Sequence, residues 1–242
     1  MTGAALIVGA GDATGGAIAR AFAREGLVAC VNRRATNADK LEQLAQSIRD
    51  EGLLARAYPA DAREEDQMIA MVDAIKRDVG AIEVAVFNIG ANVNFPITEM
   101  TARVYRKVWE MACFSGFLMG REVARHMLTR ERGTIIFTGA TASLRGGSGF
   151  SAFSGAKAAL RMLAQSMARE LGPKNIHVAH SIIDGPIDTD FIAQRIGDIE
   201  AARAADAVLS PDEIAKNYVM LHRQVRSAWT HELDLRPWTE RF

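Results

Sequence analysis

A glycine-rich turn follows the first apolar run of the chain. Residues Ala4–Val8 lead into Gly9-Ala10-Gly11-Asp12-Ala13-Thr14-Gly15-Gly16, and an alanine-rich helical segment comes next. Glycines at such a junction let the backbone approach a pyrophosphate, which binds the unpaired N–H groups at the helix start. A tight strand-to-helix connection that binds nothing also favours glycine. The turn therefore indicates a dinucleotide site only together with a second signal.

The second signal is Asn32-Arg33-Arg34, at the end of the next apolar run. An NAD-binding protein usually places Asp or Glu there, against the ribose 2′-hydroxyl. Arginine instead matches a 2′-phosphate through paired hydrogen bonds, so the sequence favours NADP, with NAD as the alternative. Two other interpretations stay open: both arginines are solvated loop residues, and the carboxylate of Asp12 repels the phosphate.

Short apolar runs alternate with longer amphipathic stretches along the chain. Strands are expected at Ala4–Val8, Val28–Val31, Leu54–Tyr58, Val84–Phe87, Thr134–Thr138 and His177–Ile183. Helices are expected near Gly16–Glu25, Asn37–Gly52, Glu65–Val79, Thr101–Leu128 and Ser151–Leu171. This alternation predicts an α/β protein with a three-layer, doubly wound parallel sheet, the Rossmann fold. No linker or repeat divides residues 1–242, so a single domain is expected.

Composition narrows the classes of partner. The 242 residues carry 29 Lys+Arg and 29 Asp+Glu, so nothing in the net charge of zero attracts nucleic acid. No stretch approaches the roughly 18 apolar residues that a membrane-spanning helix needs. The two cysteines form no pair and the five histidines show no metal-ligand spacing. These features predict a cytoplasmic protein without a metal, acting on a small-molecule substrate.

The C-terminal quarter departs from the alternating pattern. Residues 190–209 are expected to form irregular helices, and Pro211–Arg223 a helix capped by Ser210. Residues 190–230 are therefore expected to be a helical insertion within the domain that covers the substrate. An oligomer contact is the alternative.

The chain resembles the short-chain dehydrogenase/reductase family from residue 4 to about residue 190. The landmarks appear in the family's order: the turn Gly9–Gly15, Asp61 with Ala62, Asn88-Ile89-Gly90, Phe153–Lys157, and Gly185-Pro186-Ile187-Asp188-Thr189. The resemblance implies nicotinamide dinucleotide binding by Gly9, Gly11, Asp12, Ala13, Thr14, Gly15, Arg33, Arg34, Asp61, Ala62, Asn88, Gly90, Lys157, Gly185, Pro186, Ile187 and Thr189.

The resemblance also implies a catalytic group, and this chain departs from it. The family transfers a proton through a tyrosine whose pKa a lysine lowers, with a serine and an asparagine nearby. Here Phe153 stands at the tyrosine position, Ala140 at the serine position and Cys113 at the asparagine position, while Lys157 is kept. Phenylalanine has no proton to exchange, so the proton path must differ.

The remaining candidate residues have two interpretations each. Lys157 either holds the nicotinamide ribose or acts as a weak acid, if burial lowers its pKa. The Thr141 hydroxyl either orients a substrate oxygen or caps a turn. Cys113 is a small packing residue rather than a nucleophile, because no histidine neighbours it in the sequence.

Two functions follow from these replacements. The first is an NAD(P)-dependent oxidoreductase that transfers hydride to or from a small carbonyl, alcohol or enone by an altered proton path. The second is an inactive regulatory or scaffold protein that has kept the nucleotide fold. Substrate contacts are expected after Thr189 and in the loop before Phe153, where the sequence offers apolar bulk. The helix around Met111–Gly120 is apolar on nearly every side, which indicates either deep burial or, as the family resemblance suggests, an interface that it forms with Ser151–Leu171 in a homodimer or homotetramer.

Overall fold

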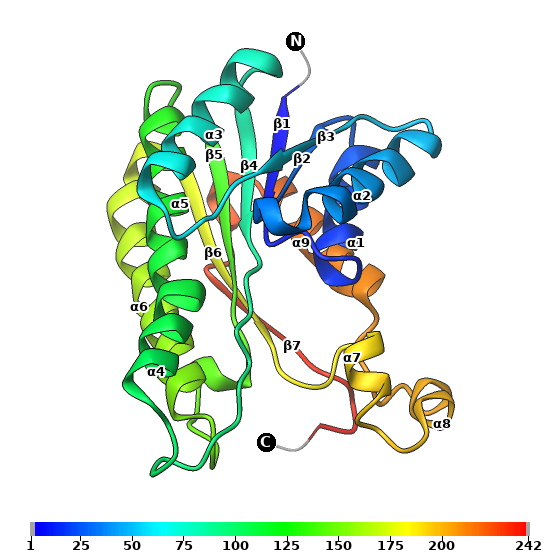
Figure 1. The fold of residues 1–242 in the computed structure, drawn as a ribbon. Helices are drawn as coiled ribbons and strands as arrows, with labels where there is room; N and C mark the ends of the chain where they lie inside the picture. Colours follow the sequence, from blue (N-terminus) through cyan, green and yellow to red (C-terminus); the bar gives the residue numbers. More distant parts are fainter. Residues whose placement is uncertain (1–2, 241–242) are drawn as a thin grey trace.

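A computed structural model describes residues 3–240 of the chain. Its seven strands are β1 (Ala4–Val8), β2 (Val28–Arg33), β3 (Ala55–Pro59), β4 (Ile82–Phe87), β5 (Gly133–Thr138), β6 (Ile176–Ile183) and β7 (Glu232–Leu235). They form one sheet in the order β3-β2-β1-β4-β5-β6-β7, and every neighbouring pair is parallel (Figure 1).

Helices cover both faces of this sheet. They are α1 (Thr14–Arg24), α2 (Ala38–Asp50), α3 (Glu65–Asp78), α4 (Ala102–Trp109), α5 (Ser115–Leu128), α6 (Ser151–Leu171), α7 (Asp190–Ala193), α8 (Ile199–Ala204) and α9 (Pro211–Arg223). Helices α3, α5 and α6 pack on one face, and α1, α2 and α9 on the other (Figure 1). The predicted three-layer, doubly wound fold is therefore confirmed.

The direction of strand addition reverses between β1 and β4. From β1 the chain adds β2 and β3 on one side, and β4, β5 and β6 follow on the other. All five residues of β1 are buried, which explains its unbroken apolar sequence. In open parallel sheets, ligands bind beside this reversal, at the carboxyl ends of the strands. The glycine turn after β1 lies at this point.

The predicted helix at Thr101–Leu128 is interrupted. Residues Glu110–Phe114 form a π-helical turn between α4 and α5. The hydroxyl of Ser115 donates to the carbonyl of Met111, and a Cβ at Gly116 would lie 2.6 Å from Leu160 of α6. Hydrophobic periodicity did not reveal this turn, because the segment is apolar on nearly every side. Single-turn π-helices of this kind are frequent at functional sites.

The C-terminal quarter divides into two parts. Helix α9 begins at the predicted cap, where the Ser210 hydroxyl accepts from the amide of Glu213, and it buries Tyr218 and Leu221 against the sheet. The tail after α9 supplies the short strand β7. Helices α7 and α8 lie apart from the sheet, at the lower right of Figure 1. Among residues 3–240, no helix is long and apolar enough to cross a membrane.

Candidate functional site

The glycine turn is fixed by its contact with the end of β4. Gly9 has a φ of +91°, and a Cβ there would lie 2.9 Å from the backbone of Asn88 and Ile89. The Asn88 amide nitrogen donates to the Gly9 carbonyl at 3.2 Å. Ala13, at the N-cap of α1, makes no side-chain cap. The N-terminal amides of α1 thus lack the side-chain partner that a cap would provide, and they suit a phosphate.

A cavity of about 270 Å³ opens between this turn and the ends of β2 and β3. Arg33 and Arg34 line it. Asn32 is buried, and its side chain donates to the carbonyls of Tyr58 and Ala60, so it braces β3. Because the Asn32 amide is bound to these carbonyls, Arg33 and Arg34 are the residues after β2 that are available to bind a ribose substituent in this cavity.

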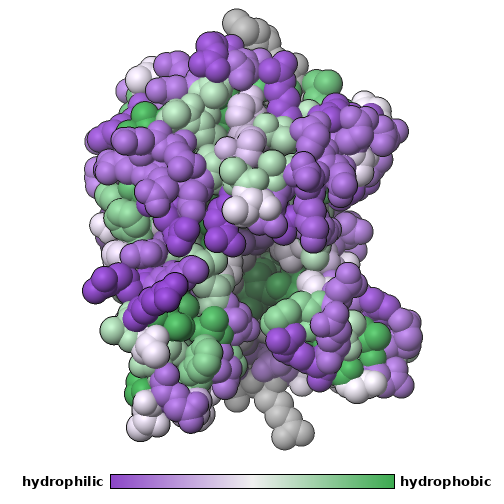
Figure 2. Space-filling view, viewed as in Figure 1, coloured by the Kyte–Doolittle hydropathy of each residue, from purple (hydrophilic) through white to green (hydrophobic). Residues whose placement is uncertain are grey.

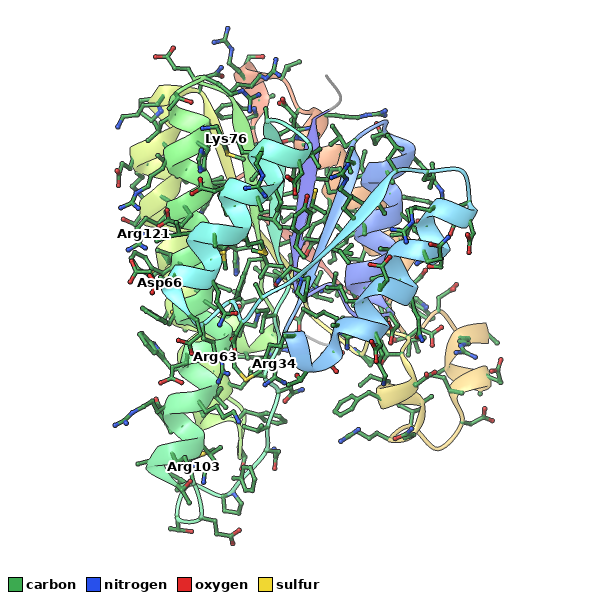
Figure 3. The ribbon with its side chains drawn as sticks, turned by 45° about the horizontal axis from the view of Figure 1, so that its top comes forward. Arg34, Arg63, Asp66, Lys76, Arg103 and Arg121 are labelled. Atoms are coloured by element: carbon green, nitrogen blue, oxygen red, sulfur yellow. The ribbon has the colours of Figure 1, made fainter. Side chains whose placement is uncertain are left out.

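Each acidic residue predicted at this end carries an arginine partner. Arg33 Nη1 lies 3.5 Å from Asp12 Oδ1. Arg63 donates twice to Asp61, at 2.9 and 2.5 Å, and its hydrogen bonds lower the pKa of that carboxyl. Arg34 and Arg63 lie near each other at the cavity, whereas Arg103 lies farther along α4 (Figure 3). Three arginines, Arg33, Arg34 and Arg63, therefore line the cavity, together with the carboxylate of Asp61.

A second cavity, of about 610 Å³, continues past the ends of β4, β5 and β6. The two cavities share Asn88, Ile89 and Gly90. Apolar side chains dominate the second one, and Figure 2 shows an apolar hollow beside the lobe that contains α7 and α8. Among the residues that line it are Thr14, Ala140, Thr141, Arg145, Phe150, Phe153, Ser154, Lys157, Ile183, Gly185, Pro186, Ile187, Thr189, Phe191 and Ile192.

Lys157 is the most perturbed group of this cavity. Its ammonium donates to the carbonyls of Ile89, at 3.0 Å, and Thr138, at 2.8 Å. No acidic side chain forms an ion pair with it among the described residues. Burial lowers the pKa of Lys157 from 10.5 to about 7. This lysine is therefore able to exchange a proton near neutral pH.

The three replaced positions surround Lys157 with apolar groups. The Phe153 ring centroid lies 5.9 Å from Lys157 Nζ. Cys113, in the π-helical turn, packs in one buried cluster with Phe153, and burial raises the pKa of its thiol. Ala140 contributes only a methyl group. The predicted packing role of Cys113 agrees with this placement.

The sequence analysis missed an ionic network behind this cavity. The Thr141 hydroxyl donates to Asp184 at 2.5 Å, and Asp184 is fully buried. Two guanidinium groups also approach Asp184: that of Arg145 at 3.5 Å and that of Arg236 at 3.3 Å. The expectation that the loop before Phe153 offers only apolar bulk is wrong, because Arg145 lies on it. The sequence signal that could have indicated this network is the carboxylate of Asp184, which directly precedes the predicted cofactor residue Gly185.

The structure brings most predicted site residues to the two cavities. Four predicted residues line neither: Asp12, Ala13, Gly15 and Cys113. Gly15 lies under the turn, where a Cβ would come within 2.6 Å of the Gly9 carbonyl oxygen. Of the segment 190–230, Phe191 and Ile192 reach the second cavity, while α9 packs on α1. In the described part of the chain, no group of His, Cys, Asp or Glu side chains could hold a metal.

These features fit a nicotinamide dinucleotide. The glycines keep side chains out of the turn, the arginines border one cavity, and Lys157 lines the adjoining one. Together they define a doubly wound protein with a dinucleotide cradle at its topological switch point.

Comparisons with known proteins place the chain in a family. The family model described as short chain dehydrogenase matches residues 3–199. A crystal structure of a short-chain dehydrogenase from Rhodopseudomonas palustris is 48% identical with a TM-score of 0.83, covering 98% of this chain and 99% of that chain. The 2-dehydro-3-deoxy-D-gluconate 5-dehydrogenase of Formosa agariphila is 29% identical over 204 residues, 79% of this chain and 77% of the relative. The cis-4-hydroxycyclohexanecarboxylate dehydrogenase of Sinomonas cyclohexanicum is 28% identical over 222 residues, which are 90% of this chain and 88% of the relative.

The chain belongs to the short-chain dehydrogenase family. It is an oxidoreductase that uses a nicotinamide cofactor and acts on small molecules. The relatives give no support to the alternative of an inactive nucleotide-binding protein.

Proposed function

We propose that this protein catalyses NADP-dependent hydride transfer between the nicotinamide and a small carbonyl or alcohol, with Lys157 as the proton donor and acceptor. The observation that carries the proposal is the buried Lys157 ammonium in the cavity wall, with a pKa of about 7. A general acid works best when its pKa lies near the working pH. Phe153 cannot take this role.

Four side chains of the cavity, Thr141, Phe150, Phe153 and Lys157, have a part in this scheme. When bound, the nicotinamide supplies the hydride that reaches the carbonyl carbon. The Lys157 ammonium gives one proton to the carbonyl oxygen, becomes a neutral amine, and regains a proton from water; the oxidation of an alcohol runs the same steps in reverse. The Thr141 hydroxyl donates its proton to Asp184, so its oxygen is left to accept a hydrogen bond from the hydroxyl of an alcohol substrate. The apolar wall formed by Phe150 and Phe153 excludes water.

The preference for NADP over NAD rests on the first cavity. Arg33 and Arg34 both line it, and no acidic side chain follows β2 directly to bind a ribose hydroxyl pair. A 2′-phosphate would replace Asp12 as the partner of Arg33. Apart from Asp12, Ala13 and Gly15, the other predicted cofactor residues line one of the two cavities, and we assign those residues to cofactor binding on that basis.

The segment that covers the substrate is narrower than residues 190–230. Phe191 and Ile192 line the second cavity, and the Arg203 guanidinium holds Asp188 with two hydrogen bonds of 2.8 Å. Helix α9 belongs to the sheet packing instead. We therefore assign the covering role to residues 187–209.

A homodimer or homotetramer is also part of the proposal. Tyr105, Trp109 and Phe117, on α4 and α5, expose 43%, 42% and 37% of their surface in the isolated chain. Trp109 stacks on Phe114, so these rings form a preorganised apolar face that suits a second copy. The proposed cytoplasmic location is supported by two free cysteines, Cys30 and Cys113.

The decisive experiment measures NADPH oxidation with a panel of small ketones, aldehydes and enones. We expect turnover by the native chain and a loss of at least about 100-fold in kcat for Lys157→Met. Binding of NADP, followed by calorimetry, tests the shared premise separately. A native chain that binds NADP but never turns over, while the Phe153→Tyr, Ala140→Ser double variant does, would overturn the proposal.

A further inference from the structure

One charged side chain of the second cavity has no part in the proposed chemistry. Arg145 lies on the loop between Thr141 and α6, and it lines the cavity together with Phe150 and Phe153. Its side chain is 46% exposed, so the guanidinium is reachable from the cavity. Arg145 and Lys157 are the only charged side chains that line this cavity in the described chain, and neither Asp nor Glu does.

The contact with the buried carboxylate of Asp184 leaves the Arg145 guanidinium able to bind a second anion. The two groups are 3.5 Å apart, and the second contact of Arg145, with Glu240, is 3.8 Å. Strong guanidinium–carboxylate pairs are shorter, about 2.7 to 2.9 Å. Asp184 has nearer partners in Thr141, at 2.5 Å, and Arg236, at 3.3 Å. Asp184 therefore orients the Arg145 side chain, while most N–H groups of the Arg145 guanidinium make no hydrogen bond to it.

The rest of the wall indicates what this arginine meets. Phe150, Phe153, Ile183, Phe191 and Ile192 make the cavity largely apolar. An arginine at the rim of an apolar cavity pairs best with a carboxylate, because its planar donors match two oxygens. The cavity thus suits a small molecule with a hydrocarbon body and an acidic end.

We infer that Arg145 binds the carboxylate of the substrate, so that the protein acts on hydroxy or oxo carboxylic acids. This inference rests on the proposed function, because it places the substrate carbonyl at Lys157 while the carboxylate is held at Arg145. Asp184 is a positioning residue, which orients both the Thr141 hydroxyl and the Arg145 guanidinium. Arg145 determines which carbonyl compounds are accepted.

The test compares two ligands that differ in charge alone. Binding of cyclohexanecarboxylate and of cyclohexanecarboxamide to the NADP-saturated chain is measured by calorimetry. We expect the native chain to bind the carboxylate at least about 10-fold more tightly, and Arg145→Gln to remove that preference. Arg145→Lys should keep part of it, and Arg169→Gln, on the outer surface of α6, should change nothing.

Equal binding of the two ligands by the native chain overturns the inference without any variant, so a misfolded Arg145→Gln cannot hide the answer. A preference that survives in a folded Arg145→Gln overturns it too. Turnover separates this inference from the proposed function. If the neutral ketone cyclohexanone is reduced and 4-oxocyclohexanecarboxylate is not preferred in kcat/KM, the oxidoreductase stands and the inference fails. Carboxylate binding through Arg145 without any turnover supports the site and overturns the reaction.

Discussion

The ammonium nitrogen of Lys157 lies 5.9 Å from the centre of the Phe153 ring, at the position where the family motif that the sequence resembles has a tyrosine. The ring face attracts a cation weakly. Burial has the larger effect, because the pKa of Lys157 is lowered to about 7. With phenylalanine at position 153, Lys157 is the group that we propose to titrate at the site.

The first prediction is a pH profile. Reduction needs protonated Lys157, so kcat for NADPH-dependent reduction should be level below about pH 7 and fall about tenfold per unit above it. Alcohol oxidation needs the neutral amine, so its kcat should rise about tenfold per unit up to about pH 7 and be level above it. Stopped-flow measurement of both directions checks this.

Lys157→Arg separates proton donation from cofactor holding. Arginine stays protonated, so the variant should retain NADP binding within a few fold and lose turnover at every pH. A Lys157→Arg variant that reduces substrate at the native rate contradicts the proton role.

The second prediction concerns stability. The pKa of Lys157 is about 7 in the folded chain and 10.5, the ordinary value of a lysine, in the unfolded chain, so the unfolded chain binds more protons between these pH values. The free energy of unfolding therefore rises with pH across this window, by at most about 1.4 kcal/mol per unit from this group. Below pH 7 both states are protonated and the contribution is constant.

Urea unfolding at pH 7 and pH 8.5 measures this effect. The native chain should gain stability relative to Lys157→Met as the pH rises. A constant difference between the two proteins would show that the buried lysine does not titrate there. Measuring the variant at both pH values removes the contribution of every other group.

The sequence predicted the sheet and its cofactor edge because both depend on local signals. Apolar runs such as Ala4–Val8 are unbroken where a strand is covered on both faces. Glycine is required at position 9 because the backbone there has a positive φ and Asn88 approaches closely. The turn could therefore be predicted from its glycines. The family order of motifs then located Lys157 and the loop beginning at Gly185.

Contacts between residues far apart in the sequence could not be predicted from the sequence. Asp184 meets Thr141 across 43 positions, and Arg236 comes from the C-terminal tail. The sequence alone does not distinguish Arg145 from a solvated loop arginine, because its place in the cavity wall depends on residues from several distant segments. The inward turn of Asn32 likewise depends on carbonyls of β3 and the residue after it.

The third prediction concerns Asp12. Its carboxylate competes with a 2′-phosphate for Arg33, which it approaches to 3.5 Å. Asp12→Asn should therefore tighten NADP binding roughly two- to fivefold, the range of an exposed ion pair, and leave NAD unchanged. Arg33→Gln should weaken NADP at least about tenfold. Equal effects on both cofactors, measured by calorimetry at low salt, would refute the 2′-phosphate assignment.

The fourth prediction is a stabilising substitution. Ala91 follows Gly90 at the cavity edge and has a φ of +139°, which is strained for a residue with a Cβ. Ala91→Gly should raise the free energy of unfolding by about 1 kcal/mol, since relief of strain exceeds the added entropy of glycine. Ala158→Gly, at an exposed position of helix α6, should instead lower it by about 1 kcal/mol. Chemical denaturation of both variants decides the sign.

The fifth prediction concerns assembly. Trp109 exposes 42% of its surface and stacks on Phe114 at 5.6 Å between ring centroids. A buried aromatic residue at the centre of an interface commonly contributes more than 2 kcal/mol to association, and a carboxylate there would be left unpaired. Trp109→Glu should therefore shift the protein to a monomer of 26.3 kDa in light scattering.

Val225→Glu provides the matched control for this shift. Val225 is 67% exposed and lies after α9, away from the proposed interface on α4 and α5. The same charge placed there should leave the assembly intact. Native protein that already scatters as a monomer at micromolar concentration would contradict the proposed homo-oligomer. If Val225→Glu dissociates the assembly as readily as Trp109→Glu does, the interface lies on the α9 side of the sheet.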